Sequence, residues 1–215
     1  MTVRANARLA GFMFLFYIAT GVTEIVLFNP ISKVSGTAAK FAAMAQHPTL
    51  MRFGSVFALI SMADALILGV ALYALTRDYD RDLAILALMF RVAEGVVDLP
   101  AAFVGRARLA VATSDANTVN TLGPVLIKLQ GFGALLGATA FAIGSTLFCY
   151  LFLRARLIPV SLSWIGLIGS AVLVIGLPLQ LAGILTSPVT SLMWIPIAIF
   201  EVTVAFWLLI KGISV

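Results

Sequence analysis

Apolar residues occur along this chain in six long runs that are separated by shorter polar stretches. Each run covers about 20 residues, the length that a helix needs to cross the roughly 30 Å hydrocarbon core of a membrane. The runs therefore predict an all-α integral membrane protein, a six-helix transmembrane bundle that forms one transmembrane domain over residues 1–215. The expected spans cover residues 9–28, 53–75, 83–104, 125–153, 162–185 and 192–210.

The connections between these runs differ in length, and those at residues 29–52 and 105–124 are the longest. We therefore expect short cytoplasmic loops and two longer outer loops. Within the first long connection, residues 38–46 predict a short helix lying on the membrane surface, with Lys40 and Phe41 at the interface. This arrangement would leave most of the polar sequence on the outer side of the membrane.

Basic residues stand mostly at the ends of the runs and indicate the orientation. With a cytoplasmic N-terminus, seven Lys and Arg residues lie inside and six outside, a small difference in the expected direction. The inner connections are also the shorter ones. The sequence thus favours a multi-pass protein of a bacterial inner membrane with both termini in the cytoplasm.

Composition narrows the function classes. Hydrophobic residues make up 62% of the chain and charged residues 11%, which excludes a soluble domain. The net charge of +5 comes from span ends, where basic residues meet anionic lipid headgroups, and so it does not indicate nucleic-acid binding. A single cysteine and a single histidine exclude disulfides and histidine-rich metal sites within one chain. No metal ligand set or common hydrolase motif is present, and cofactors and enzymatic activity stay open.

The stretch from Phe90 to Pro100 places three charged residues inside an apolar run. At about 100° per residue, Arg91, Glu94 and Asp98 fall within one narrow arc of a helix. Each charge at mid-membrane costs roughly 2.5–3.5 kcal/mol on insertion scales, so this arc must face protein or water and not lipid. The bundle is therefore predicted to have a buried ionic centre.

Further polar residues occur inside other expected spans. Counting the third span, five of the nine acidic residues are intramembrane, and one arginine cannot neutralise all of them. At 1.5 Å rise per residue they fall at two adjacent depths around the middle of the membrane. The remaining candidates for the same polar centre are Glu24, Asp64, Glu201, Tyr17 and Gln130.

Two functions of different classes account for this centre. The first is a carboxylate–arginine cavity that binds a small ligand or a cation, with proton-coupled transport as the activity that it would serve. The alternative is a non-transporting sensor or accessory subunit, in which ion pairs and hydrogen bonds only hold the helices together. Expected partners are the lipid bilayer and either another membrane protein or a second copy of the chain.

Three short motifs carry a family resemblance. They are Arg8-Leu-Ala-Gly11, Phe90-Arg91-Val-Ala-Glu94 and the final-span pattern Phe200-Glu201-x5-Trp207-Leu-Leu-x-Lys211-Gly212. With these motifs the chain resembles a bacterial family of short six-span membrane proteins catalogued as a domain of unknown function (number four-three-eight-six). The resemblance covers nearly the whole chain. It implies a helical inner-membrane protein and supplies neither an activity nor catalytic residues.

Overall fold

The computed structural model describes residues 2–213, except for the side chain of Asp98. This part of the chain consists of helices and turns, without a strand. The helices are α1 (Val3–Ser32), α2 (Thr37–Gln46), α3 (Pro48–Thr76), α4 (Arg81–Ala112), α5 (Ala116–Ala155), α6 (Val160–Leu181), α7 (Val189–Leu192) and α8 (Ile195–Ile210). The predicted all-α class is thereby confirmed.

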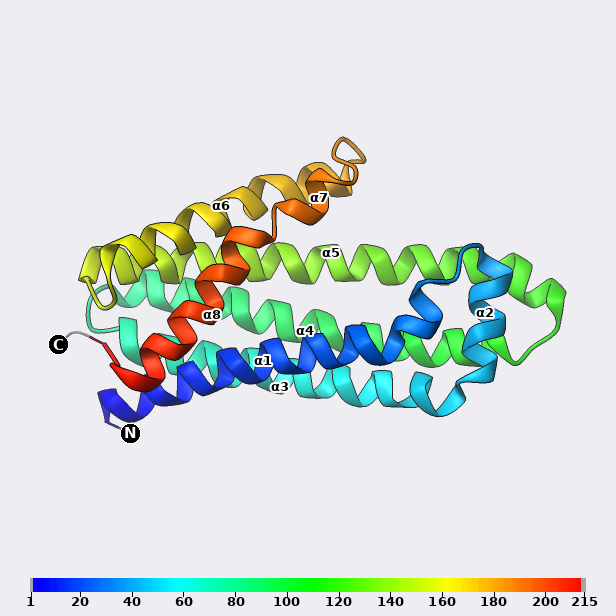
Figure 1. Cartoon of the computed structure of the whole chain (residues 1–215), viewed down its shortest axis with the longest axis horizontal. Helices are drawn as coiled ribbons and strands as arrows, with labels where there is room; N and C mark the ends of the chain where they lie inside the picture. The colour runs from blue at the N-terminus through cyan, green and yellow to red at the C-terminus, as the bar shows by residue number, and fades with distance from the viewer. Residues whose placement is uncertain (1, 214–215) are drawn as a thin grey trace.

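Four long helices form the body of the molecule. Helix α4 packs between α3 and α5, and α1 packs on α3 and α8. Figure 1 shows α6 and α8 covering one half of this body, while α2 lies across its opposite end. The N- and C-termini both lie at the end of the molecule far from α2 (Figure 1). The two halves therefore differ, because only one of them is covered by α6 and α8.

Within the described residues, five helical segments are long and apolar enough to cross a membrane: α1, α3, α5, α6 and the segment Val189–Ile210 that contains α8. Their outward faces carry large apolar side chains, such as Ile25 at 73% exposure. In water such an apolar surface would favour aggregation, whereas in a lipid bilayer it is the expected exterior. The chain is a multi-pass membrane protein. Helix α4 is not among the five, since its apolar sequence is interrupted by charges.

Of the two longer connections expected, the one after residue 104 is wrong, whereas the one between α1 and α3 remains long and contains α2. Helix α1 continues through Asn29 and Pro30 to Ser32, and only residues 113–115 separate α4 from α5. The residues after position 104 are rich in Ala, Leu and Arg, which favour helix. At the start of α5, Asp115 accepts hydrogen bonds from the backbone N–H and the hydroxyl of Thr118, both at 2.9 Å. This cap begins α5 nine residues earlier than the expected span.

The expected short helix exists as α2, but its orientation differs from the prediction. Phe41 does not lie at the membrane interface, because its side chain is 1% exposed and packs in a cluster with Ile31, Met44 and Met51. Gly123 of α5 makes this possible, since a Cβ there would lie 2.8 Å from a methyl group of Thr37 and 3.0 Å from the Phe41 ring. Helix α2 therefore closes one end of the bundle.

Candidate functional site

The centre of the structure is an ion pair on α4. Arg91 Nη1 lies 2.7 Å from Glu94 Oε2, and both side chains are almost fully buried. The two residues are three positions apart and so share one face of the helix. Tyr17 of α1 donates a hydrogen bond from its hydroxyl to Glu94 Oε1 at 3.2 Å. The pair therefore ties α1 to α4.

Aromatic rings complete the surroundings of the guanidinium group. The Arg91 Cζ atom lies 5.3 Å from the ring centre of Phe141 and 5.9 Å from that of Tyr17, within the range of cation–π attraction. Phe141 in turn stacks on Trp194, with their ring centres 6.2 Å apart. Arg91 Nε and Nη2 have no hydrogen-bond acceptor among the described residues. The ring faces supply the negative potential that an acceptor would otherwise provide.

Small residues on the neighbouring helices make room for this arginine. A Cβ atom on Gly69 of α3 would lie 2.9 Å from Arg91 Cβ. On the other side, a Cβ atom on Gly144 of α5 would lie 3.4 Å from Arg91 Cδ. Close approach of helices at glycine is a common packing device in membranes. The cost of burying Arg91 is thus reduced by packing, by its ion pair and by the aromatic rings.

Two further carboxylates lie near enough to Arg91 to interact with it electrostatically, Asp64 of α3 and Glu201 of α8. Asp64 is 2% exposed, and neither of its oxygens has a hydrogen-bond partner among the described residues. Glu201 lines a cavity of about 10 Å³ together with Arg91 and Ser145. That volume suits about one water molecule and nothing larger. The described side chains of the ionic centre therefore form a packed cluster with room for about one water molecule.

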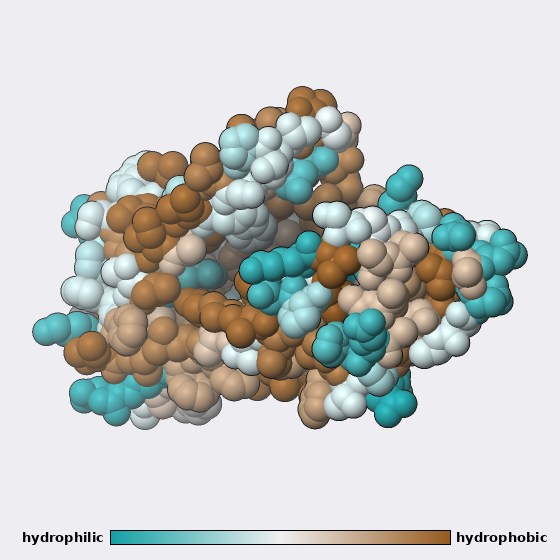
Figure 2. Space-filling view, turned by 45° about the vertical axis from the view of Figure 1, so that its right-hand side comes forward, coloured by the Kyte–Doolittle hydropathy of each residue, from teal (hydrophilic) through white to brown (hydrophobic). Residues whose placement is uncertain are grey.

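A much larger cavity, of about 500 Å³, lies in the half of the molecule that α2 closes. Five helices contribute to its wall, from α1 to α5. Figure 2 shows this face hollowed, with hydrophilic residues gathered beside the recess. We call this space the α2-end cavity. Its wall comprises Glu24, Phe28, Ile31, Ser32, Lys40, Met51, Gly54, Ala58, Ser61, Ala101, Gly105, Arg108, Ile127, Gln130, Gly131 and Ala134.

The wall of the α2-end cavity carries three charges, on Glu24, Lys40 and Arg108. None of the three forms a salt bridge within the described chain. Arg108 Nε and Gln130 Oε1 are both buried without a hydrogen-bond partner in that same part of the chain. Most other wall residues are apolar or small. A largely apolar cavity with a few unsatisfied polar groups is the usual character of a small-molecule site.

The residues predicted from sequence fall into two groups. Arg91, Glu94 and Tyr17 contact one another, with Asp64 and Glu201 close to the arginine. The two others, Glu24 and Gln130, line the α2-end cavity. The side chain of Asp98 lies outside the described residues, so its place in either group stays a prediction. A single polar centre was expected, and the residues divide between a packed cluster and an open cavity.

The sequence interpretation missed two cavity residues, Lys40 and Arg108. Basic residues near a run's end predict a membrane boundary, but Arg108 also lies on the Glu94 face of α4, because positions 94, 101, 105 and 108 are spaced by seven, four and three residues. That periodicity is the signal that identifies it. Lys40 had no such signal, because its place in the wall depends on how α2 folds back over the bundle.

The model of a family described as "Domain of unknown function (DUF4386)" matches residues 9–212. The chain belongs to this family. The match includes both the ionic cluster and the α2-end cavity, so each is part of the DUF4386 domain. Searches of curated proteins and of solved structures found no match to this chain.

Among the residues that the structure describes, no three His, Cys, Asp or Glu side chains come close enough together to hold a metal ion. Glu94, Glu201 and Asp64 each interact electrostatically with the Arg91 guanidinium. A cation would compete there with a positive charge that is already paired to Glu94.

Proposed function

We propose that this protein binds a small organic ligand in the α2-end cavity, within a bacterial inner membrane that its chain crosses six times. One observation carries the proposal: a cavity of about 500 Å³ whose wall holds three charges without salt bridges among the described residues. Small-molecule sites occupy about 300–1,000 Å³. Charged groups lose hydration when they line such a space, and a bound ligand offsets that loss.

Six crossings require α4 to span the membrane in addition to the five apolar segments. Helix α4 lies between α3 and α5, so Arg91 and Glu94 face protein and not lipid. The two termini lie at the same end of the bundle, as an even number of crossings demands (Figure 1). We assign that end to the cytoplasm, which leaves α2 and the cavity on the outer side. The whole chain then acts as one membrane domain.

The ionic cluster would anchor the bundle beneath the ligand. Ser61 lines the α2-end cavity, and Asp64 lies less than one helical turn further along α3. Asp64 has no hydrogen-bond partner in the described chain, so it is the group that we propose to exchange a proton when the ligand moves. With Asp64 in this role, the activity that we propose to be linked to ligand binding is proton-coupled transport.

A second candidate, a non-transporting sensor or accessory subunit, is favoured by the tight packing around Arg91. The guanidinium contacts Glu94 and two aromatic rings in a space that holds at most about one water molecule. A rigid centre of this kind suits a subunit that binds a second membrane protein or a second copy of itself. Ligand binding without transport would fit this candidate.

Filling the cavity tests the ligand-binding proposal. Gly131 lines the cavity, and a Cβ there has no atom within 4 Å, so Gly131→Phe places a ring in the cavity without a backbone clash. Gly133→Phe is the matched control, because it has the same open space on the same helix but lies outside the cavity wall. We expect native mass spectrometry to show small-molecule adducts on the wild type and on Gly133→Phe, and to show none on Gly131→Phe. Equal adducts on all three proteins, or none on the wild type, would contradict the proposal.

A further inference from the structure

The α2-end cavity also indicates which class of ligand it takes. Resting on the ligand-binding function proposed above, we propose that the ligand is a single-tailed amphiphile with one anionic group, a carboxylate or a phosphate. Its anionic group would lie between Arg108 and Lys40, and its apolar tail along the small apolar residues of α3, α4 and α5 that line the deeper part of the cavity. Charge, depth, access and size each support this assignment.

The charges of the wall favour an anion. Arg108 and Lys40 carry two positive charges and Glu24 one negative charge, so the cavity has a net charge of +1. A ligand with a single negative charge neutralises it. Arg108 Nε is a buried donor without a partner among the described residues, and guanidinium groups bind carboxylate and phosphate by paired hydrogen bonds. The cationic residues therefore select the headgroup.

Depth in the membrane places that headgroup near the bilayer surface. Arg108 follows Glu94 by 14 residues on the continuous helix α4, which corresponds to about 21 Å along its axis. With the Arg91–Glu94 pair at the middle of the bilayer, the hydrocarbon core ends after about 15 Å. Arg108 therefore lies among lipid headgroups. Glu24 and Ser61 lie deeper, at the level of the acyl chains.

Access to the cavity is sideways, from the lipid. Helices α1 and α5 both line the cavity but do not pack extensively on one another in the described chain, whereas α2 covers the end of the bundle. The space between α1 and α5 thus faces the bilayer. Deeper than Arg108 the wall is largely small and apolar, with Ala58 on α3, Ala101 on α4 and Ala134 on α5. An amphiphile can enter with its headgroup at the membrane surface and its tail in the acyl-chain layer.

Size limits the ligand to one tail. A cavity of about 500 Å³ is in the range that encloses a drug-sized molecule. A headgroup and one alkyl chain fill such a space, whereas a headgroup with two alkyl chains would need a larger cavity. The proposed class includes fatty acids and alkyl phosphates, and it excludes free inorganic phosphate, which would leave the apolar wall uncovered.

Four probes separate the contribution of the headgroup charge from that of the tail. They are dodecanoate, dodecanol, dodecyltrimethylammonium and inorganic phosphate. A fifth, phosphatidylglycerol, tests a two-tailed lipid with the same charge. Each is titrated against the full-length protein in a nonionic detergent, and binding is measured by native mass spectrometry. We expect dodecanoate to bind at least about 10-fold more tightly than every other probe, the factor that a charged hydrogen bond supplies.

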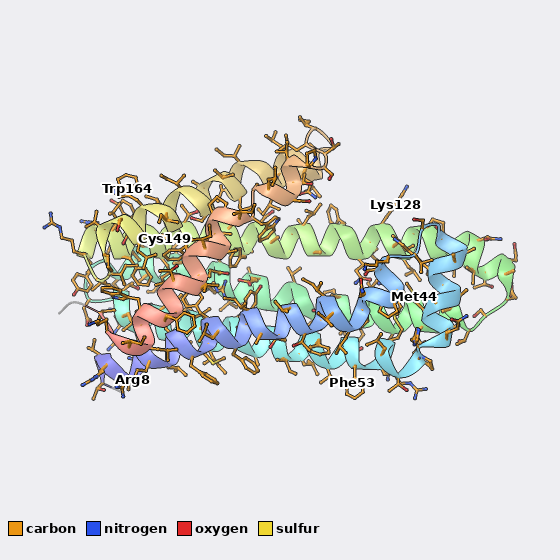
Figure 3. All side chains as sticks on the ribbon, viewed as in Figure 1. Arg8, Met44, Phe53, Lys128, Cys149 and Trp164 are labelled. Carbon is orange, nitrogen blue, oxygen red and sulfur yellow. The ribbon has the colours of Figure 1, made fainter. Side chains whose placement is uncertain are left out.

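Variants of the cationic residues show whether the headgroup lies where we place it. Arg108→Gln and Lys40→Gln should each weaken dodecanoate binding by about 10-fold and leave dodecanol binding unchanged. Glu24→Gln should strengthen dodecanoate binding, because it removes a negative charge from the wall. Lys128→Gln is the control: Lys128 lies on α5 near the same end of the molecule but is exposed and points away from the body (Figure 3). It should bind dodecanoate as the wild type does.

Several outcomes would overturn the assignment. Equal binding of dodecanol and dodecanoate would show that no anionic group is recognised, and preferential binding of dodecyltrimethylammonium would assign the headgroup to Glu24. Tighter binding of inorganic phosphate or phosphatidylglycerol would replace the single-tailed class. In all these cases Gly131→Phe should still abolish binding, so the ligand-binding function would stand.

Binding that Gly131→Phe leaves intact would instead show that the cavity is not the site. A melting temperature for each variant separates loss of binding from loss of fold.

Discussion

Arg91 and Glu94 lie three positions apart on α4 and form a buried ion pair, with 2.7 Å between Nη1 and Oε2. Removing one partner of such a pair leaves an uncompensated buried charge and costs about 3–5 kcal/mol of unfolding free energy. Arg91→Ala should therefore destabilise the protein strongly in detergent. Arg91→Ala combined with Glu94→Gln should recover part of that loss, which thermal unfolding can measure.

Arg154→Ala provides the control for this prediction, because Arg154 forms an exposed pair with Asp80 at 2.9 Å. Exposed pairs contribute about 0–1 kcal/mol, so this variant should unfold near the wild-type temperature. A double mutant that is no more stable than Arg91→Ala would show that Glu94 is not the main partner of the arginine.

Packing around Arg91 gives a second prediction. Gly69→Leu should destabilise the bundle, because even a Cβ at this position lies 2.9 Å from Arg91 Cβ, and neither helix can move away without opening the core. Overpacking of this kind typically costs about 1–3 kcal/mol. Gly133→Leu, in open space on α5, should be neutral in the same thermal measurement. If both variants melt together with the wild type, α3 and α4 are not packed as closely as described.

The sequence predicted the helical fold well because each apolar run is longer than any soluble core requires. The ionic centre was equally predictable from the sequence. Arg91 and Glu94 are neighbours on one helix face, and the free-energy cost of exposing their charges to lipid requires that they be buried. The division of the polar residues was not predictable. It depends on which helices touch: Tyr17 reaches Glu94, while Glu24, two turns further along α1, faces a space that α5 does not close.

Helix ends were the least predictable feature. The expected loop after residue 104 is helix in the structure, because helix-favouring residues continue beyond the apolar run and Asp115 caps the next helix. Hydropathy reports the membrane boundary and not the helix boundary. Phe41 shows the same limit, since its burial depends on Gly123, some eighty residues away in the sequence.

The cap of α5 predicts a pH dependence. Hydrogen bonds from the backbone N–H and then the hydroxyl of Thr118 hold the pKa of Asp115 below its ordinary value. A lowered pKa in the folded state means that this contribution to stability is present above the ordinary carboxyl pKa and is lost as pH falls through the lowered pKa. Asp115→Asn should keep the cap but remove this part of the acid-induced loss.

The measurement is the melting temperature of wild type and variant over the acid range. Asp78→Asn serves as the control, because the one contact of the Asp78 carboxylate within the described chain is an exposed one with Arg77 at 3.7 Å. An Asp115→Asn profile that overlies the wild-type profile at every pH would contradict the role given to this cap.

The topology is tested most sharply across α4. If α4 crosses the membrane, a reporter inserted in the turn at residues 77–80 and one inserted at 113–115 must report opposite sides. We expect the first to be cytoplasmic and the second periplasmic, with a fusion after Lys211 cytoplasmic as well. Two turns on the same side would remove α4 from the membrane, and a periplasmic fusion after Lys211 would reverse the assigned orientation.

A density map of the full-length protein in lipid nanodiscs tests the central claim most directly. We expect non-protein density in the α2-end cavity, reaching from Arg108 toward Ala58 and continuous with the opening between α1 and α5. A cavity closed by contact of α1 with α5, with Arg108 paired directly to Glu24, would contradict it.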